Sequence, residues 1–212
     1  MLNYITRYPD RVWGYFLDHV QLTVLALAIA LLIALPIGLW LSRNKRAQGP
    51  VLGLLSILYT IPSLALFVIL VPLVGLGTIN AVTALVIYAQ VVLVRNIVTG
   101  LEGVPESVLE AGRGMGMSGA QLFRQVELPL ALPVIIVGLR VATLSTIGIG
   151  TIAALVGAGG LGRLLFDGVQ QNNSGKIWAG ALAVSLLAIA INALLRRAES
   201  YAGRATHLNE KR

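Results

Sequence analysis

The chain has 212 residues, of which 57% are hydrophobic and only 12% are charged, and its mean hydropathy is +0.83. A soluble domain carries about twice that share of charge, so the composition predicts one membrane-embedded bundle. The sequence has no cysteine, which excludes a disulfide framework and thiolate chemistry. In a membrane chain the net charge of +7 reflects loop bias and attraction to anionic lipid, and we expect no nucleic-acid partner.

Residues 1–19 contain charged side chains and no apolar core, so they do not have the pattern of a signal peptide. Trp13, Tyr15 and Phe16 lie beside Arg11 and Asp18, which favours a short interfacial segment. The alternative is an ordered lead-in without a function of its own.

Five later segments are long and apolar enough to cross a bilayer, which takes roughly 20 residues of closed helix. They run over residues 20–41, 51–74, 80–98, 130–156 and 177–195. Pro36, Pro62 and Pro72 lie inside two of them, where neighbouring helices can take up the freed carbonyls. The sequence therefore predicts an all-α polytopic bundle with five transmembrane helices, a loop over residues 99–129 and a tail over residues 196–212.

The Lys and Arg residues between these segments predict the orientation. Ten fall on one side, namely Arg43, Lys45, Arg46, Arg113, Arg124, Arg196, Arg197, Arg204, Lys211 and Arg212. Four fall on the other, namely Arg7, Arg11, Arg163 and Lys176. Cytoplasmic loops carry the excess of Lys and Arg, so we expect the N-terminus outside, and the C-terminus and the 99–129 loop inside.

Helix signals divide the 99–129 loop into two short helices. Pro105 and Glu106 suit the start of the first, because Pro fits the first turn and Glu suits the positive end of the helix dipole. Ser118 and Gln121 form a capping box, which predicts that a second helix begins near Gly119 and ends before Pro129.

Two features of this loop point to a partner. Gly112, Gly114 and Gly116 are poor residues for a helix interior, and they predict a bend or a close approach to another backbone. Leu122 and Phe123 are apolar residues on a polar helix, and we expect them to be exposed and to fit a groove of the partner. The alternative is an ordinary loop folded against its own bundle.

The 130–156 segment has small residues at every fourth position, which let helices pack closely: Gly138, Ala142, Thr146, Gly150 and Ala154. This helix should therefore be central. The hydroxyl groups of Thr143, Ser145 and Thr146 either line a wet path or bond the carbonyls of their own helix.

Three further side chains in the spans are candidates for a translocation path. Arg140 is a charge inside a span and hence a functional hypothesis, although it can also snorkel to the near interface, as Arg95 should. Tyr59 and Tyr88 either pack between helices or contact a cationic ligand.

The sequence does not support the presence of an enzyme active site or a cofactor site. Gly114, Gly116 and Gly119 spell G-x-G-x-x-G, as do Gly157, Gly159 and Gly162, but neither set follows a soluble strand. The sequence contains no phosphate-binding loop of the G-x-x-x-x-G-K-[ST] type and no clustered metal ligands, so we expect neither catalysis nor a cofactor on this chain.

The residues from Glu110 to Pro129 resemble the loop by which permeases of ATP-binding-cassette (ABC) importers dock on their ATPase. That pattern is Glu-Ala-Ala, three residues, Gly, nine residues, Ile, one residue, Leu-Pro. Here Glu110, Ala111 and Gly112 open it, Gly116 follows at the same spacing, and Val126, Leu128 and Pro129 close it. The resemblance implies a type I importer permease fold with a cytoplasmic coupling helix, and it makes Leu122 and Phe123 candidate contacts with the ATPase.

Several longer runs are similar to the osmoprotectant permeases, which import glycine betaine, choline and carnitine. They are residues 59–67, 95–101, 112–117 and 126–133. The resemblance implies a multi-pass protein of the bacterial cytoplasmic membrane, partnered by two ATPases, a second permease and a periplasmic or lipid-anchored binding protein. The alternatives are a methionine-type amino-acid importer and, as a different class, a passive channel, which would need no docking loop.

Overall fold

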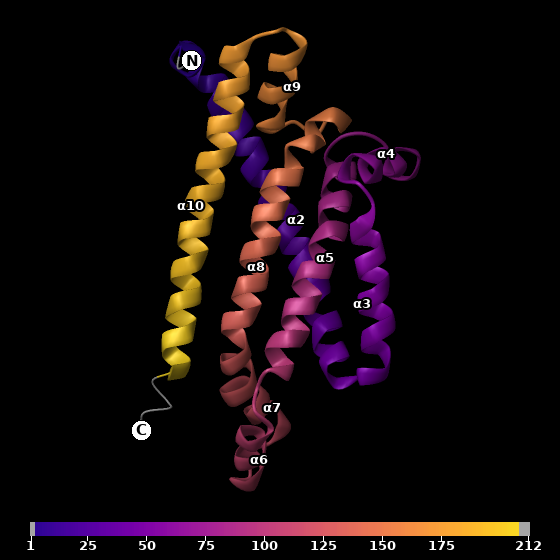
Figure 1. Ribbon diagram of the computed structural model, residues 1–212, viewed down its shortest axis with the longest axis vertical. Coiled ribbons are helices and arrows are strands. Elements are labelled where there is room, and N and C mark those ends of the chain that lie inside the picture. Colours follow the sequence, from indigo (N-terminus) through magenta and orange to yellow (C-terminus); the bar gives the residue numbers. More distant parts are fainter. Residues whose placement is uncertain (1–2, 208–212) are drawn as a thin grey trace.

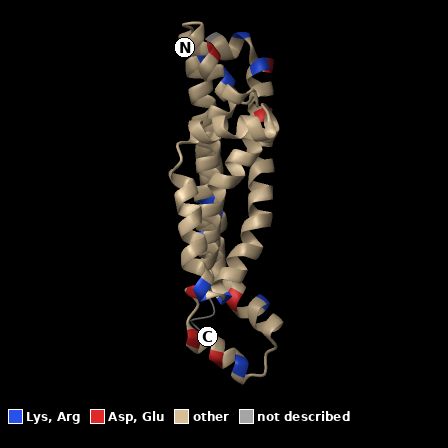
Figure 2. Ribbon diagram, turned by 90° about the vertical axis from the view of Figure 1, so that its right-hand side faces the viewer, with Lys and Arg blue, Asp and Glu red and all other residues tan. Residues whose placement is uncertain are grey.

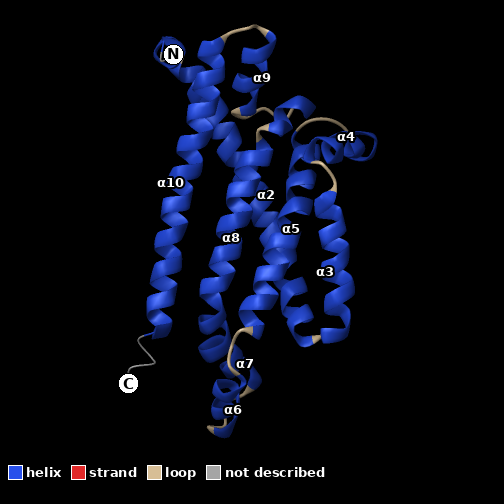
Figure 3. Cartoon of the chain, viewed as in Figure 1, coloured by secondary structure: helices blue, strands red, loops and turns tan. Residues whose placement is uncertain are grey.

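The computed structural model describes residues 3–207, and within them every regular element is a helix (Figures 1 and 3). The helices are α1 (Asn3–Arg7), α2 (Pro9–Arg43), α3 (Lys45–Thr60), α4 (Ser63–Val74), α5 (Thr78–Glu102), α6 (Glu106–Gly114), α7 (Gly119–Leu122), α8 (Leu128–Gly150), α9 (Gly162–Gln170) and α10 (Ser174–His207). A π-helical turn, Phe123–Glu127, joins α7 to α8, and a 3₁₀ turn, Ile152–Val156, follows α8. The tail charges Lys211 and Arg212 and the side chain of Arg204 lie outside the described residues.

The predicted all-α membrane bundle is confirmed, with a difference in the second span. Four helical stretches of the described chain are long and apolar enough to cross a membrane: Pro9–Arg43, Thr78–Glu102, Gly119–Gly150 and Ser174–Gly203. The expected continuous 51–74 helix is instead the pair α3 and α4, bent by 98°. Ile61 is extended at the break because the ring of Pro62 disfavours the helical region for the residue before it.

Two other expected boundaries also differ. The 130–156 helix ends at Gly150, and the chain continues in the 3₁₀ turn to a left-handed Gly157. At the N-terminus, residues 9–19 are no separate segment but the first three turns of α2. At 1.5 Å per residue this 35-residue helix is about 52 Å long, against about 30 Å of bilayer hydrocarbon, so it extends beyond the apolar layer.

The core is built around α5, which packs against α2, α8, α3 and α4 (Figure 1). In its apolar stretch 72% of residues are buried, against only 17% in α10, which lies at the edge of the bundle. Close contact between α5 and α8 depends on Gly138, where a Cβ atom would lie 2.3 Å from the Cβ of Asn96. Gly138, Ala142, Thr146 and Gly150 are all buried, so α8 is central as expected.

Charged residues gather at the two ends of the bundle, and the long middle section is almost uncharged (Figure 2). One end holds α6, α7, the turn between α2 and α3 and the C-terminal end of α10, and the other holds α1, α4 and α9 (Figure 1). The described Lys and Arg residues that the charge bias assigns to opposite sides of the membrane thus lie at opposite ends of one elongated molecule.

Candidate functional site

The candidate site is the hairpin of α6 and α7, which projects from the end of the bundle between α5 and α8 (Figure 1). Pro105 is extended and caps α6, and Glu106 occupies the first turn, as the sequence predicts. The α6 helix buries Leu109 and Gly112 against the bundle and exposes its other face. Arg113 and Glu106 pair at 2.7 Å on that exposed face, where such a pair adds little stability.

The turn after α6 is a Schellman motif. The N–H of Met117 donates to the carbonyl of Gly112 at 3.2 Å, and the N–H of Gly116 donates to that of Arg113 at 2.9 Å. This motif needs a left-handed residue, and Gly116 has φ +77°. In the described part of the chain, no atom beyond the two neighbouring residues lies within 4 Å of the position of a Cβ on Gly116, so its requirement here is the positive φ and not a close approach.

The close approach occurs at Gly112 instead. A Cβ there would lie 2.5 Å from Cδ1 of Leu122 and 3.3 Å from the sulfur of Met117. The capping box of α7 is present: the Gln121 N–H donates to Oγ of Ser118 at 3.4 Å, and the Ser118 N–H donates to Oε1 of Gln121 at 2.8 Å. Gly112 thus lets α6 pack directly on α7.

The second loop helix does not end before Pro129. It passes through the π-helical turn into α8, so residues 119–150 form one continuous helical stretch. Proline lacks an N–H and collides with the carbonyl four residues earlier in an α-helix. The π turn relieves this conflict because its hydrogen bonds reach back five residues, as from the Leu128 N–H to the Phe123 carbonyl.

Two ion pairs fasten the base of the hairpin to the neighbouring corner of the bundle. Arg43 at the end of α2 pairs with Glu127, whose side chain is only 5% exposed, and Lys45 pairs with Glu102 at 2.5 Å. From the sequence, Arg43 is expected only as an orientation charge, and no role is predicted for Glu127. The sequence does contain a signal for this pair, because Glu127 directly precedes an apolar span. A carboxylate that is buried there needs a cationic neighbour.

The residues predicted to meet a partner divide into an exposed and a buried group. Glu110, Ala111 and Gly116 are exposed. Leu122, however, is 8% exposed and belongs to the core, with Phe123, Val126 and Leu128 half-buried, and the expectation of exposure at Leu122 is wrong. The exposed large apolar side chains of the hairpin are Val108 and Met115, at 38% and 74%, and neither was predicted from the sequence.

The candidates for a translocation path lie in two separate places. The rings of Tyr59 and Tyr88 meet edge to face at 5.7 Å beside the break between α3 and α4, where the hydroxyl of Tyr88 donates to the Ile61 carbonyl. Tyr59 is 43% exposed, whereas Tyr88 is buried.

The other path candidates lie on α8. Arg140 faces α10, with Nη1 donating to Asn192 at 3.3 Å and Nε 3.1 Å from a carboxylate oxygen of Glu199, an ion pair without hydrogen-bond geometry. Thr143 donates to the carbonyl of Leu139 at 2.7 Å, the alternative expected for a hydroxyl within a helix. Thr146 is buried and Ser145 half-buried.

In comparisons with known proteins, one family model matches residues 26–205 of this chain. Its description is "Binding-protein-dependent transport system inner membrane component". The chain is 40% identical to the choline transport system permease protein OpuBB of Bacillus subtilis (strain 168), covering 86% of this chain and 84% of that protein. It is 44% identical to the osmoprotectant import permease protein OsmW of Salmonella typhimurium (strain LT2), covering 85% and 86%.

Another relative is the glycine betaine/carnitine/choline transport system permease protein OpuCB of Bacillus subtilis (strain 168), at 39% identity over 84% of this chain and 82% of that protein. Among solved structures, an inward-facing MetNI methionine ABC transporter gives a TM-score of 0.79 at 23% identity, covering 91% and 94%. An amino acid ABC transporter solved with histidines gives 0.74 at 19% identity, covering 97% and 98%. At these identities the solved structures show a shared fold.

Proposed function

Because the chain belongs to the family of binding-protein-dependent transport system inner membrane components, we propose that it is the permease subunit of an ATP-driven importer for osmoprotectants. The observation that carries the substrate class is the similarity to three permeases named for choline, glycine betaine, carnitine or osmoprotectants, at 39–44% identity over more than four fifths of each chain. Choline, glycine betaine and carnitine, the compounds that two of these names give, all carry a quaternary ammonium group.

ATP hydrolysis belongs to a separate ATPase pair, and the exposed face of the α6–α7 hairpin is the docking surface. Glu110, Ala111 and Gly116 lie on this face together with Val108 and Met115. An apolar side chain as exposed as Met115 on a charged hairpin suits insertion into a partner's groove. Leu122 and Phe123 support this surface from beneath, because they pack into the core of this chain.

The hairpin passes movement of the ATPase to the membrane part through two rigid connections. One is the unbroken helical stretch from residue 119 to residue 150, and the other is the Arg43–Glu127 pair to α2. When ATP draws two docked hairpins together, each α8 moves with its hairpin, and the paired permeases change between inward-open and outward-open states. A carboxylate at Glu110 bonds a donor of the ATPase in this arrangement.

The partner permease, a second copy or a paralogue, covers the side formed by α3 and α4. That side exposes large apolar side chains in the single chain, among them Ile57, Val68, Ile69 and Leu73. Tyr59 lies on the same side, so it borders the path between the two permeases, with Tyr88 behind it. Arg140, Thr143, Ser145 and Thr146 shape that path through the packing of α8 on its neighbours.

The chain is a multi-pass protein of the bacterial cytoplasmic membrane, with the hairpin and the C-terminus inside and the N-terminus outside. The charge difference between the two ends supports this orientation. The binding protein, periplasmic or lipid-anchored, delivers the compound at the end that holds α1, α4 and α9.

Uptake by proteoliposomes containing the permease, its ATPase and its binding protein tests this function. We expect ATP-dependent uptake of labelled glycine betaine, choline or carnitine and no uptake of methionine. Uptake of methionine alone would assign the chain to the amino-acid importers, whose solved members share its fold. Flux of the same size without ATP would indicate a channel.

A further inference from the structure

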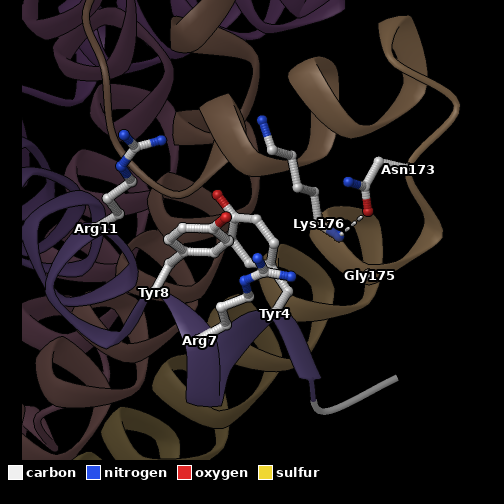
Figure 4. Close-up of a pocket in the computed structure, with 7 residues that line it drawn as sticks. All are labelled: Tyr4, Arg7, Tyr8, Arg11, Asn173, Gly175 and Lys176. Carbon is white, nitrogen blue, oxygen red and sulfur yellow. Dashed lines mark hydrogen bonds between the residues drawn. The ribbon is translucent and has the colours of Figure 1, made fainter.

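The end of the bundle opposite the hairpin contains a cavity of about 420 Å³ that the transport mechanism does not use. It lies between α1, the start of α2 and the first turn of α10. Figure 4 shows the rings of Tyr4 and Tyr8 at its centre, with Arg7 beside them and Arg11 and Lys176 on either side.

The cavity is strongly cationic. The guanidinium carbons of Arg7 and Arg11 lie 5.7 and 5.5 Å from the ring centre of Tyr8, and the ammonium group of Lys176 lies 5.8 Å from that of Tyr4. In the described part of the chain, no carboxylate forms an ion pair with any of the three cations. Lys176 donates only to the amide oxygen of Gln171, at 2.8 Å, which leaves it further donors.

The start of α10 increases this positive charge. Asn173 precedes the helix, and its side-chain oxygen accepts the N–H of Lys176 at 3.2 Å. The positive end of the dipole of a 34-residue helix therefore faces the same cavity. Three cations without a counter-ion favour an anionic group, and they repel the quaternary ammonium group of the proposed substrates.

Two exposed tryptophans place the cavity at the level of lipid headgroups. Trp13 is 59% exposed and stacks on Phe16 one turn and a half along α2 from Tyr8, and Trp178 is 43% exposed two residues after Lys176. Tryptophan and tyrosine concentrate at the two membrane interfaces. In α10, which carries Trp178, only 17% of the apolar stretch is buried, the lowest share among the four continuous spans of the described chain, so the cavity opens beside a lipid-facing surface.

We propose that this cavity binds the phosphate of an anionic phospholipid headgroup. Arg7 and Arg11 each present a planar fork of donors to the phosphate oxygens, and Lys176 adds a point charge. The two tyrosines fix the cations by contact with their rings and donate from their hydroxyls. The proposal depends on insertion in a membrane and not on which compound is transported.

Native mass spectrometry of the purified, detergent-solubilised permease complex tests the proposal by titration with phosphatidylglycerol and with phosphatidylcholine. We expect one phosphatidylglycerol to bind tightly to each wild-type permease. The Arg7→Gln/Arg11→Gln double variant should bind it about 25-fold more weakly, since each cation near a membrane surface contributes about fivefold. The Arg7→Lys/Arg11→Lys variant keeps both charges but loses the planar forks, so it should bind phosphatidylglycerol more tightly than the double glutamine variant and more weakly than the wild type. This order of affinities separates loss of charge from misfolding.

Arg163→Gln is the matched control, because Arg163 lies at the same end but pairs with Asp167 at 3.7 Å and does not line the cavity. Equal binding of the two lipids to wild type, or wild-type affinity in the double variant, would overturn the proposal. Displacement of phosphatidylglycerol by millimolar inorganic phosphate would assign the cavity to a soluble anion. If the double variant loses association with the binding protein but still binds the lipid, the cavity instead binds a carboxylate of that protein.

Discussion

Two loops of this chain spell the same G-x-G-x-x-G pattern, and the structure uses them in opposite ways. In the α6–α7 hairpin, Gly116 has φ +77° and no atom lies near its missing Cβ. In the loop that leads into α9, Gly157, Gly159 and Gly160 also have positive φ, but Gly160 and Gly162 press against the bundle. The first loop leaves its glycines open to a partner, whereas the second packs Gly160 and Gly162 against the chain itself.

The second loop packs against His19 of α2, and this contact explains why its glycines are used differently from those of the first loop. His19 of α2 is fully buried, and its Nε2 lies 3.1 Å from the carbonyl of Ile147. A Cβ on Gly160 would lie 2.9 Å from the other ring nitrogen, and one on Gly162 would lie 1.9 Å from the carbonyl oxygen of Thr151. Glycine spacing therefore predicts a turn, and the surrounding side chains decide whether that turn serves packing or binding.

The strongest test of this contrast is Gly162→Ala. The added methyl group meets backbone atoms of Thr151, which cannot rotate away, so the loop and α9 must shift. We expect a loss of stability of about 3 kcal/mol, at the upper end of the usual range for overpacking, and a lower yield of assembled protein. The measurement is thermal unfolding in detergent by circular dichroism.

Gly114→Ala is the control in the other loop, since nothing lies within 4 Å of its Cβ position and its φ is not positive. It should melt at or slightly above the wild-type temperature, because alanine is the better helix residue. Equal melting temperatures for Gly162→Ala and the wild type would show that the second loop is not packed as described.

Hydrophobicity and capping signals predicted much of this molecule, because they act within a few residues. The spans, the start of α6 at Glu106 and the Ser118–Gln121 box all follow from local sequence. The break at Pro62 was not predicted, since a proline inside a span either kinks or breaks the helix depending on its neighbours.

The direction of the Leu122 side chain also could not be predicted from the sequence. A π turn adds a residue to one helical turn, so the faces before and after it are out of phase with a regular helix. Because that turn directly follows Leu122, counting residues from α8 does not show which face of α7 is buried. Glu127 is a similar case, since its partner Arg43 is 84 residues away.

Gly116→Asp separates binding from folding in the hairpin. The aspartate must adopt a positive φ, which costs roughly 1 kcal/mol, and it places a charge on the proposed ATPase surface. We expect normal insertion and nearly normal melting, with loss of ATPase co-purification and of at least nine tenths of ATP-driven uptake. Gly116→Asn is the matched control, because asparagine tolerates the same φ without charge. If Gly116→Asp couples as well as the wild type, the hairpin is not the connection to the ATPase.

The smallest expected effect is that of Gly112→Ala, which replaces the glycine by the alanine of the importer loop pattern. Its methyl group would meet the end of the Leu122 side chain at 2.5 Å, and a terminal methyl can rotate where a backbone carbonyl cannot. Alanine also gains up to about 1 kcal/mol of helix propensity over glycine in α6, which offsets the repacking. We therefore expect a change in stability within about 1 kcal/mol and uptake within twofold of the wild type, measured by melting and by proteoliposome assay. A loss as large as that of Gly162→Ala would mean that the hairpin is packed as rigidly as the opposite loop, and the contrast between the two would fail.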